Sequence, residues 1–581
     1  MALNNVRGFF KNNNSFDLAP AVFKHDSNII YSRLPVKSVD KMYIDWGDAS
    51  PLDVVQPGHA ASHTYHVDLL NAGIRPIIQV FTPSLYFQNG DNSNITILQF
   101  GDALVTDATY GFSSVGISAH DSPKFAFGAK LDIAFLGREF DSSSIDAINS
   151  WDVSNVTSMQ NTFKDASNLS GACTSWDTSN VTDMSGMFEG VNYGNLDLNS
   201  WDTSAVTDMS SMFKDTVALY PSFYGWDTSN VTDMNDMFRR AINFNGYVSA
   251  WDVSSVTDMS SMFSGCTNFN QNINNWDVSS VTDMSNMFET AWNFNQPLNN
   301  WDVSSVTDMS SMFSGCTNFN RDISVWNTSA VTNMTSMFKR ASYFNQPLNN
   351  WDVSSVTDMS SMFSYATNFN QPLNNWDTGN VTDMRVMFAV ADNFNQPLNN
   401  WDTGNVTSMV NMFNSAINFN QNLNSWDTSN VTEMLQMFYN AFSFNGDIGN
   451  WDTGNVTDMT SMFKRASYFN KPLNNWDVSS VTDMRNMFET AWNFNQNLNS
   501  WDVSSVTRMS NMFYGAQDFN GAIEDWDVSN VTTMNGMFRD AYYFYRDISG
   551  WCVTNITSEP LFFSTGSTLP QAHKPVWGTC P

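Results

Sequence analysis

Hydrophobic residues recur with a fixed period of 25 residues through most of the chain. Tryptophan occupies every twenty-fifth position from Trp151 to Trp551, which places 17 of the 21 tryptophans on one register. Counting each of these tryptophans as position 1, position 6 is valine or isoleucine and position 7 is threonine in all 17 copies. Periods of about 20 to 50 residues are typical of solenoids and related arrays. We therefore predict sixteen stacked repeats over residues 151–550.

Two hydrophobic spacings share each repeat. Around the repeat boundary, Leu348, Trp351 and Val353 follow the pattern Leu-x-x-Trp-x-Val, and the alternation about Asp352 is typical of a strand. Positions 6, 9, 12, 13 and 16 then recur at helical spacing. Serine or asparagine at position 5 with aspartate at position 8 resembles a capping box that begins this helix. Phenylalanine at position 19 precedes Asn, Gln, Pro or Gly, which are turn residues.

Each repeat is therefore predicted to be a short strand, a short helix and a turn. A single repeat cannot bury its Trp, Val, Met and Phe side chains, whereas stacked repeats can. The predicted fold class is an α/β repeat solenoid, with a parallel sheet on the concave face and short helices on the other, preceded by a small β-sandwich. Asparagine at position 20 and threonine at position 7 would form ladders that satisfy backbone groups at the turns.

The repeat resembles a known family. Residues 304–319 (Ser-Ser-Val-Thr-Asp-Met-Ser-Ser-Met-Phe-Ser-Gly-Cys-Thr-Asn-Phe) are similar to BspA-type leucine-rich repeats. Residues 344–359 (Phe-Asn-Gln-Pro-Leu-Asn-Asn-Trp-Asp-Val-Ser-Ser-Val-Thr-Asp-Met) more closely resemble the mycoplasma-type repeat of surface proteins. The resemblance covers residues 151–581 and implies a leucine-rich-repeat solenoid on a cell surface or in viral and protist proteins, usually in adhesion. It implies no catalytic residues.

The ends of the array differ from its middle. Residues 97–150 are predicted to be an N-terminal cap of degenerate repeats, and residues 551–581 a partial repeat with a C-terminal cap, where Pro560 ends the helical pattern. Residues 41–92 alternate in the manner of an antiparallel β-sandwich. Their Trp-Gly-Asp at 46–48 and His-Thr-Tyr at 63–65 resemble the PKD domain, although alanine follows where that family prefers glycine. Residues 1–40 are an irregular segment that could lead into a strand or serve as an anchor.

The chain is strongly acidic, with a net charge of −31. Nucleic acids and anionic membranes reward basic patches, so we expect neither as a partner. No apolar run is long enough to span a membrane, and we see no signal peptide at the N-terminus. If the protein acts outside a cell, a virus particle is one carrier that needs no such signal. Five cysteines do not make a disulfide framework; Cys552 and Cys580 are either a terminal staple or two buried thiols.

The sequence predicts no enzyme. All six histidines lie outside the repeats, so no Ser-His-Asp or Cys-His arrangement can form within the array. His59, His63 and His66 are close enough in sequence to suggest a metal site, but His63 and His66 would point to opposite faces of a strand. We favour a structural role for His63, as the PKD resemblance implies.

Aspartate at position 2 is the most regular charged feature, and two interpretations fit it. Neighbouring carboxylates about 5 Å apart repel by roughly 0.8 kcal/mol in bulk water, so the row must be relieved. One interpretation is a row of Ca²⁺ sites, since Ca²⁺ takes carboxylate oxygens; the other is that each carboxylate accepts hydrogen bonds in an Asx turn. We favour the second because one carboxylate per turn supplies few ligands. The candidate metal ligands are Asp252, Asp277, Asp302, Asp352 and Asp377.

The repeats vary mainly at positions 14, 15, 17 and 18, where aromatic and basic residues appear. These residue types carry interface energy and stack on sugars, although relaxed constraint at surface loops explains such variation equally well. The candidate ligand-binding residues are Trp292, Trp492, Tyr343, Tyr365, Tyr439, Tyr468, Tyr514, Arg340 and Arg465.

These observations predict a non-enzymatic recognition or adhesion protein, exposed on a virion or cell surface. Its solenoid would bind a host or neighbouring cell-surface protein or glycan, and its N-terminal domain would attach to virion or envelope proteins. The alternative is a structural surface-layer, capsid-decoration or spacer protein. No cofactor is required by either hypothesis, and Ca²⁺ is the one ion that the acidic row suggests.

Overall fold

The computed structural model describes most of the repeat array and separate pieces of the N-terminal region. The chain divides into two compact units, residues 1–280 and residues 281–581. The expected irregular segment before residue 21, and more than half of the expected PKD-like domain, lie outside the described residues. The described residues are 21–25, 31–33, 36–37, 42–46, 53–57, 59, 62–64, 77–81, 84–87, 95–100, 104–109, 111–112, 116–117, 122–191, 196–217 and 223–581.

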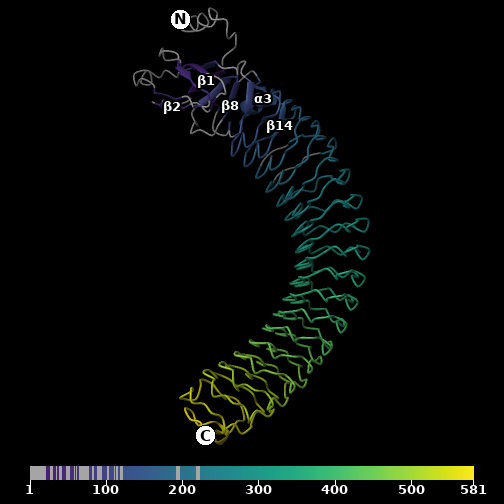
Figure 1. Cartoon of the computed structure of the whole chain (residues 1–581), viewed down its shortest axis with the longest axis vertical. Helices are drawn as coiled ribbons and strands as arrows, with labels where there is room; N and C mark the ends of the chain where they lie inside the picture. The colour runs from purple at the N-terminus through teal and green to yellow at the C-terminus, as the bar shows by residue number, and fades with distance from the viewer. Residues whose placement is uncertain are drawn as a thin grey trace, which may run out of the picture. The chain divides into compact units, whose positions relative to one another are not determined.

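Two larger sheets, of six and four strands, lie in the N-terminal region (Figure 1). The six strands of the larger sheet, in spatial order, are β11 (Gly116–Ile117), β9 (Ile95–Gln99), β1 (Ala21–His25), β7 (Ile77–Phe81), β4 (Met42–Asp45) and β5 (Asp53–Val55). The four strands of the second are β12 (Lys124–Phe125), β10 (Leu104–Asp107), β8 (Ser84–Phe87) and β3 (Val36–Lys37). Strand β1 pairs antiparallel with both β7 and β9, so residues from the expected irregular segment lie within the sheet.

Two two-stranded sheets, one helix and one 3₁₀ turn complete the described secondary structure. Strand β2 (Tyr31–Arg33) pairs with β6 (Ser62–Thr64), and β13 (Ala129–Lys130) pairs in parallel with β14 (Val156–Ser158). Helix α3 (Ser142–Asn149) begins at Asp141, whose side chain accepts the Ser144 N–H. The 3₁₀ turn η1 (Gln571–His573) lies near the C-terminus.

The residues before Trp151 continue the stacking of the repeats. The N–H of Phe135 donates to the carbonyl of Thr162 at 2.8 Å, and the Phe135 ring stacks on Phe163 at 5.0 Å. Phe112 in turn stacks on Phe135 at 5.4 Å. These are the contacts that repeats make with one another, which supports the predicted cap of degenerate repeats.

The predicted helix at positions 6–16 is wrong. The described repeats contain no α-helix, because positions 10–15 form consecutive tight turns. The N–H of Met412, for example, donates to the carbonyl of Met409 at 3.2 Å, three residues back. Asn411 between them has a φ of 57°, which ends any right-handed helix, and its N–H donates instead to Leu435 of the next repeat at 2.9 Å. Every second N–H group in this stretch thus donates to a carbonyl of the next repeat, and not to the carbonyl four residues earlier as in an α-helix.

The predicted strand around each tryptophan is also wrong, although the alternation that suggested it is confirmed. Positions 1 and 3 are buried and position 2 is exposed, but these residues have no strand pairing. Parallel pairing between repeats occurs at position 8, as single-residue bridges from Asp383 to Ser408 and from Ser408 to Glu433. The threonines at position 7 of successive repeats are joined by backbone hydrogen bonds. The Thr407 N–H, for example, donates to the Thr382 carbonyl at 3.0 Å.

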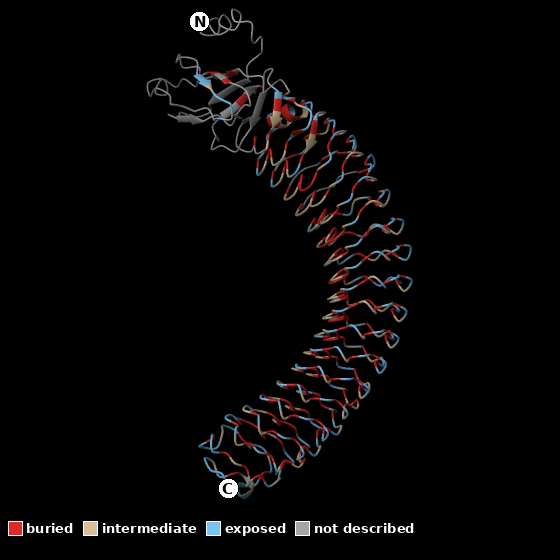
Figure 2. Cartoon of the chain, viewed as in Figure 1, coloured by how far each residue is buried: buried red, intermediate tan, exposed pale blue. Residues whose placement is uncertain are grey.

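The core consists of one continuous stack of side chains in each unit. Positions 1, 6, 9, 12, 13, 16, 19 and 23 of the complete repeats of residues 281–581 are almost wholly buried. Phe413 stacks on Phe388 at 5.6 Å and on Phe438 at 5.7 Å, and within its own repeat on Phe419 at 4.0 Å. Figure 2 shows buried and exposed residues alternating along successive turns. Stacked rings of this kind contribute about 0.5–1.5 kcal/mol per pair beyond the burial of their surface.

Most tryptophans at position 1 also donate an indole hydrogen bond that joins repeats, whereas the buried indole N–H groups of Trp151 and Trp251 have no partner. The Trp401 indole Nε1–H donates at 2.9 Å to the carbonyl of Leu373, which lies near the end of the repeat 351–375, two repeats back, and its ring stacks on Trp376 of the preceding repeat at 6.2 Å. The predicted ladder at position 20 is present as well, since Asn395 N–H donates to the Asn370 side-chain oxygen at 2.9 Å. Repeats are therefore joined by side chains at two edges and by backbone along positions 7–15.

The C-terminal turn ends the stack. Phe563 meets Phe538 edge-on at 90°, where the preceding phenylalanines lie parallel, and packs edge-on against Trp577. Cys552 and Cys580 form a disulfide, which settles the alternative between a staple and two thiols. Cys173, Cys266 and Cys316 are free and buried.

Candidate binding surface

The candidate aromatic and basic residues at the variable positions are exposed or half-buried, whereas small residues at the same positions, such as Ser364, are buried. Of the nine candidate residues, Trp292, Tyr343, Tyr365, Tyr468 and Trp492 are exposed aromatics, and Arg340 and Arg465 are exposed bases. Tyr439 and Tyr514 are half-buried. All nine belong to the unit formed by residues 281–581.

The rings of three of the tyrosines contact a basic side chain from a neighbouring repeat. The Arg340 guanidinium lies 5.6 Å from the centre of the Tyr365 ring, and Lys464 Nζ lies 5.9 Å from that of Tyr439. Arg539 lies 5.2 Å from the centre of the Tyr514 ring. Such contacts are worth about 0.5–1 kcal/mol at exposed sites. These pairs join adjacent turns, which leaves Tyr365, Tyr439 and Tyr514 with a structural role.

A second group of rings forms a cluster that the sequence did not reveal as one site. Phe442 contacts Tyr468 at 5.0 Å and Trp492 at 6.3 Å, each edge to face. The three residues come from three consecutive repeats, and the exposed fractions of Phe442, Tyr468 and Trp492 are 38%, 51% and 45%. The phenylalanine at position 17 was the available signal, but only the stacking of repeats brings its ring to the other two. We name Phe442, Tyr468 and Trp492 the aromatic triad.

Trp292 and Tyr343 are placed differently. Trp292 is 54% exposed and Tyr343 is exposed, yet among the described residues neither contacts another aromatic ring. The candidate set therefore divides into cation-stacked tyrosines, isolated rings and the aromatic triad.

The five candidate metal ligands at position 2 each make the hydrogen bonds of an Asx turn. Asp352 Oδ1 accepts the Ser354 N–H at 3.0 Å and the Ser354 hydroxyl at 2.6 Å. The hydrogen bond from the hydroxyl has the larger effect and that from the N–H the smaller, and together they hold the pKa of Asp352 below its ordinary value. Asp252, Asp277, Asp302 and Asp377 accept the N–H of the residue two positions on in the same way.

The Asx turns provide the relief that a row of like charges needs. Within the part of the chain that the structure describes, no three His, Cys, Asp or Glu side chains form a group that could hold a metal ion. Each position-2 carboxylate is exposed and occupied with its own turn. Ca²⁺ binding by this row stays a prediction.

A second acidic row lies at position 8, where the sequence pattern predicted part of a helix cap. Asp208, Asp233 and Asp258 occupy successive bridges and are only partly exposed. Burial is the main cause that raises the pKa of Asp233, and the charges of Asp208 and Asp258 add to it. The hydrogen bond from the Asn235 N–H acts in the opposite direction but is outweighed. Farther along, Asp483 has a lowered pKa, since hydrogen bonds and charge from Arg485 outweigh its burial.

Replacing Asp233 with asparagine is expected to stabilise the protein at neutral pH. Because the pKa of Asp233 is higher in the folded than in the unfolded state, the ionised carboxylate opposes folding. The resulting loss of stability appears as the pH rises from the unfolded-state pKa through the folded-state pKa. Asparagine fits the site, because Asn333 occupies position 8 in another repeat and accepts the Thr335 N–H at 3.0 Å. We expect a higher melting temperature for Asp233→Asn at pH 7, and a difference that disappears below the ordinary carboxyl pKa.

The matched control for this prediction is Asp483→Asn. The pKa of Asp483 is lowered, so its charge favours folding above the unfolded-state pKa and this contribution is lost as pH falls. Asp483→Asn is therefore expected to lower the melting temperature at pH 7. If both variants shift it in the same direction, the assignment of opposite roles to the two carboxylates is wrong.

One protein family matches the chain. The family model described as "Mycoplasma protein of unknown function, DUF285" matches residues 130–228, 220–309, 292–397, 368–475 and 463–575. These stretches overlap and together span most of the chain.

The chain belongs to this family. The predicted mycoplasma-type repeat is confirmed, and the first match begins at residue 130, within residues 97–150, the predicted N-terminal cap. Neither the curated proteins nor the solved structures gave a match. The PKD resemblance of the N-terminal region stays a prediction.

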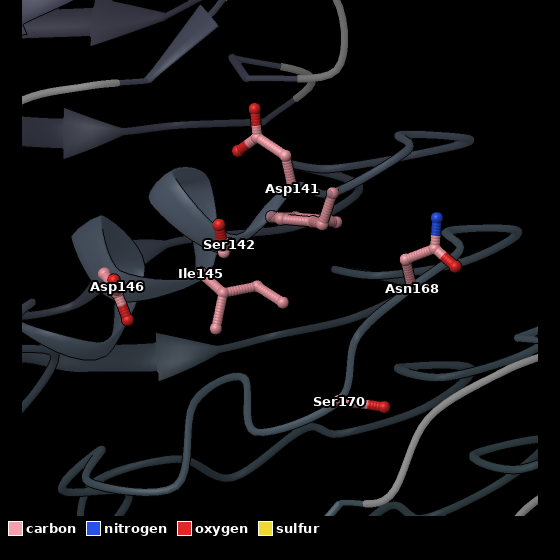
Figure 3. A pocket seen from close by; sticks show the side chains of 7 residues that line it. Asp141, Ser142, Ile145, Asp146, Asn168 and Ser170 are labelled. Atoms are coloured by element: carbon pink, nitrogen blue, oxygen red, sulfur yellow. The ribbon is translucent and has the colours of Figure 1, made fainter.

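A small pocket lies beside the first DUF285 repeats, next to α3. It is lined by Phe140, Asp141, Ser142, Ile145, Asp146, Asn168 and Ser170 (Figure 3). Asp141 is the N-cap of α3, and the Ser144 N–H first, with nearby serine hydroxyls, lowers its pKa. Asp141, one of the two carboxylates that line this pocket, thus serves as the cap of the helix.

The structure describes the side chains of two histidines, His59 and His573. His59 Nδ1 lies 3.1 Å from the Pro57 carbonyl, and His573 Nδ1 lies 2.9 Å from that of Tyr545. His66, the third member of the suggested metal trio, lies outside the described residues. Within the described part of this DUF285 protein, no helix combines the length and apolar character that crossing a bilayer requires.

Proposed function

We propose that this protein is a non-enzymatic recognition protein, which acts at the surface of a cell or virus particle and binds a cell-surface protein or glycan. The observation that carries the proposal is the set of exposed aromatic rings at positions 17 and 18, with Trp292 and Trp492 the largest. Membership of a repeat family found in mycoplasma proteins fits a surface role. The N-terminal region, if PKD-like, would attach the array to its particle or envelope.

Energetics support binding through these rings. Tryptophan, tyrosine and arginine dominate the binding energy of interfaces, while acidic residues and lysine contribute less. Exposed tryptophan rings have no role in the core, which is already filled by a separate tryptophan at position 1 of each repeat. Residues 151–550 contain no histidine, which favours binding over acid–base catalysis.

The test is binding of the intact protein to cell surfaces and to immobilised glycans, with Trp292 and Trp492 both replaced by alanine. We expect saturable binding by the wild type and a loss of at least tenfold in affinity for the double variant, with the same melting temperature. Unchanged binding by the double variant would contradict the proposal. Absence of any binding, with loss of particle integrity when the protein is removed, would support the structural alternative.

Mass spectrometry of purified particles, cell envelopes and cytosol locates the native protein. Enrichment in particles or envelopes is expected. Detection in cytosol alone would rule out a surface role and make the array an intracellular scaffold.

A further inference from the structure

We propose that the aromatic triad is a binding site for a neutral saccharide, and that this one site carries the recognition that the proposed function assigns to the array. The inference rests on that proposed function but is narrower, because it names the site and the class of ligand. It makes Trp492 essential and Trp292 dispensable, although the two tryptophans occupy the same position in their repeats.

Backbone contacts between three consecutive repeats assemble the triad. The Tyr468 N–H donates to the Phe442 carbonyl at 3.3 Å, and the Asn493 N–H beside Trp492 donates to the Ser467 carbonyl at 3.1 Å. Position 17 of the middle repeat is Ser467, which is small and buried. Because the small Ser467 side chain leaves room between the flanking repeats, the ring centres of Phe442 and Trp492 lie 6.3 Å apart.

The geometry suits a sugar ring better than a flat aromatic ligand. Phe442 is tilted 83° from Tyr468 and 87° from Trp492, so the rings make a corner rather than a continuous platform. Large parts of the Tyr468 and Trp492 surfaces stay open to solvent. A pyranose presents C–H groups to such surfaces and directs its hydroxyls outward, where polar side chains can reach them.

Exposed residues that neighbour the triad in sequence or through the backbone carry both kinds of hydrogen-bonding group. Arg465, three residues before Tyr468, is exposed, and no described residue forms an ion pair with it. Asp518 is exposed beyond Trp492, and its N–H donates to the Trp492 carbonyl at 3.0 Å. A guanidinium supplies only donors and a carboxylate only acceptors, which together match vicinal hydroxyls.

Charge balance decides for a neutral ligand. Lys464 is neutralised by Glu489 at 2.9 Å, so the charged residues next to the triad without a described ion pair are Arg465, Lys471 and Asp518. An anionic sugar would meet the Asp518 carboxylate in a chain whose net charge is already −31. A neutral oligosaccharide has no such repulsion.

The chain contains its own control. Residues 289–296 and 489–496 have the same sequence, Glu-Thr-Ala-Trp-Asn-Phe-Asn-Gln, so Trp292 and Trp492 share their local structure. Trp292 has no ring neighbour in the described residues, and Asn318 donates to its carbonyl where Asp518 donates to that of Trp492. Replacing either tryptophan should therefore affect folding equally and binding unequally.

The experiment is calorimetric titration of the full chain with neutral hexasaccharides of glucose, mannose and galactose, and with hexagalacturonate as the anionic probe. We expect at least one neutral probe to bind, Trp492→Ala to weaken it at least tenfold, and Trp292→Ala to change it less than twofold. Arg465→Gln and Asp518→Asn are each expected to weaken it severalfold, and all four variants should melt like the wild type.

Three results would overturn the inference. They are no binding of any neutral probe at millimolar concentration, tighter binding of hexagalacturonate than of every neutral probe, and equal losses for Trp292→Ala and Trp492→Ala. Cell binding that survives Trp492→Ala alone but not the double variant would reject this site and leave the proposed function standing. Cell binding that is abolished by protease treatment of the target cells, with no neutral probe bound, would identify a protein partner instead.

Discussion

Replacing Trp401 with alanine is expected to destabilise its part of the array by about 3–5 kcal/mol. The side chain is 3% exposed, stacks between Trp376 and Trp426, and donates its indole hydrogen to Leu373. Alanine would leave a large cavity, a buried carbonyl without its donor and a gap in the ring stack. Because these contacts join Trp401 to three neighbouring repeats, the loss weakens the coupling between repeats as well as the repeat itself.

Hydrogen exchange of the neighbouring amides is the appropriate measurement, since long repeat arrays need not unfold in one step. Exchange in the repeats that contain Trp376, Trp401 and Trp426 should accelerate most. The control is Trp492→Ala, which removes an exposed tryptophan and should change stability by no more than about 0.5 kcal/mol. Equal effects of the two substitutions would contradict the division between core and surface tryptophans.

Reduction of the Cys552–Cys580 disulfide is expected to destabilise the C-terminal cap by about 3–4 kcal/mol, for a loop of this length. The disulfide joins residues 28 apart and holds the last strand-like contact, in which the Val553 N–H donates to Thr579 at 2.9 Å. Since a terminal repeat protects the open end of a stack, loosening it should expose Phe538 and Phe544. Limited proteolysis should then cleave within residues 551–581.

The double variant Cys552→Ser/Cys580→Ser should be cleaved at the same place without reductant. Cys316→Ala is the control, because Cys316 is buried and unpaired and other repeats carry alanine at that position. It should behave like the wild type both with and without reductant. A wild-type cap that resists protease equally in both conditions would show that the disulfide contributes little.

The repeat sequence was sufficient to predict which residues are buried. A single repeat cannot hide Trp351, Met359 or Phe363 from water, so stacking follows from composition and period alone. The Asx turn at Asp352 was also predictable, because a carboxylate two residues before a serine has a local partner in any stacked turn. Both features depend on residues close in sequence.

The sequence could not show that the predicted helix is absent, and the reason is physical. Positions 9, 12, 13 and 16 satisfy helical spacing, but the same spacing serves a chain of tight turns that buries the same face. What decides between them is where the N–H groups go, and Asn411 donates to the next repeat instead of to its own. That choice is available only when a neighbouring repeat is in place.

The binding surface shows the same limit. Trp292 and Trp492 look alike in sequence, since eight residues around them are identical. Only the stacking of three repeats places Phe442 and Tyr468 beside Trp492, and only the cation contacts remove Tyr439 and Tyr514 from the free surface.

The sequence by itself thus determined the period, the buried positions, the exposed variable positions and the family, because each depends on residue type at fixed spacing. The tertiary structure decided the backbone path within a repeat, the pairing at position 8, the disulfide and the grouping of exposed rings. These depend on contacts between residues about 25 positions apart, and such contacts exist only after one repeat has packed on another.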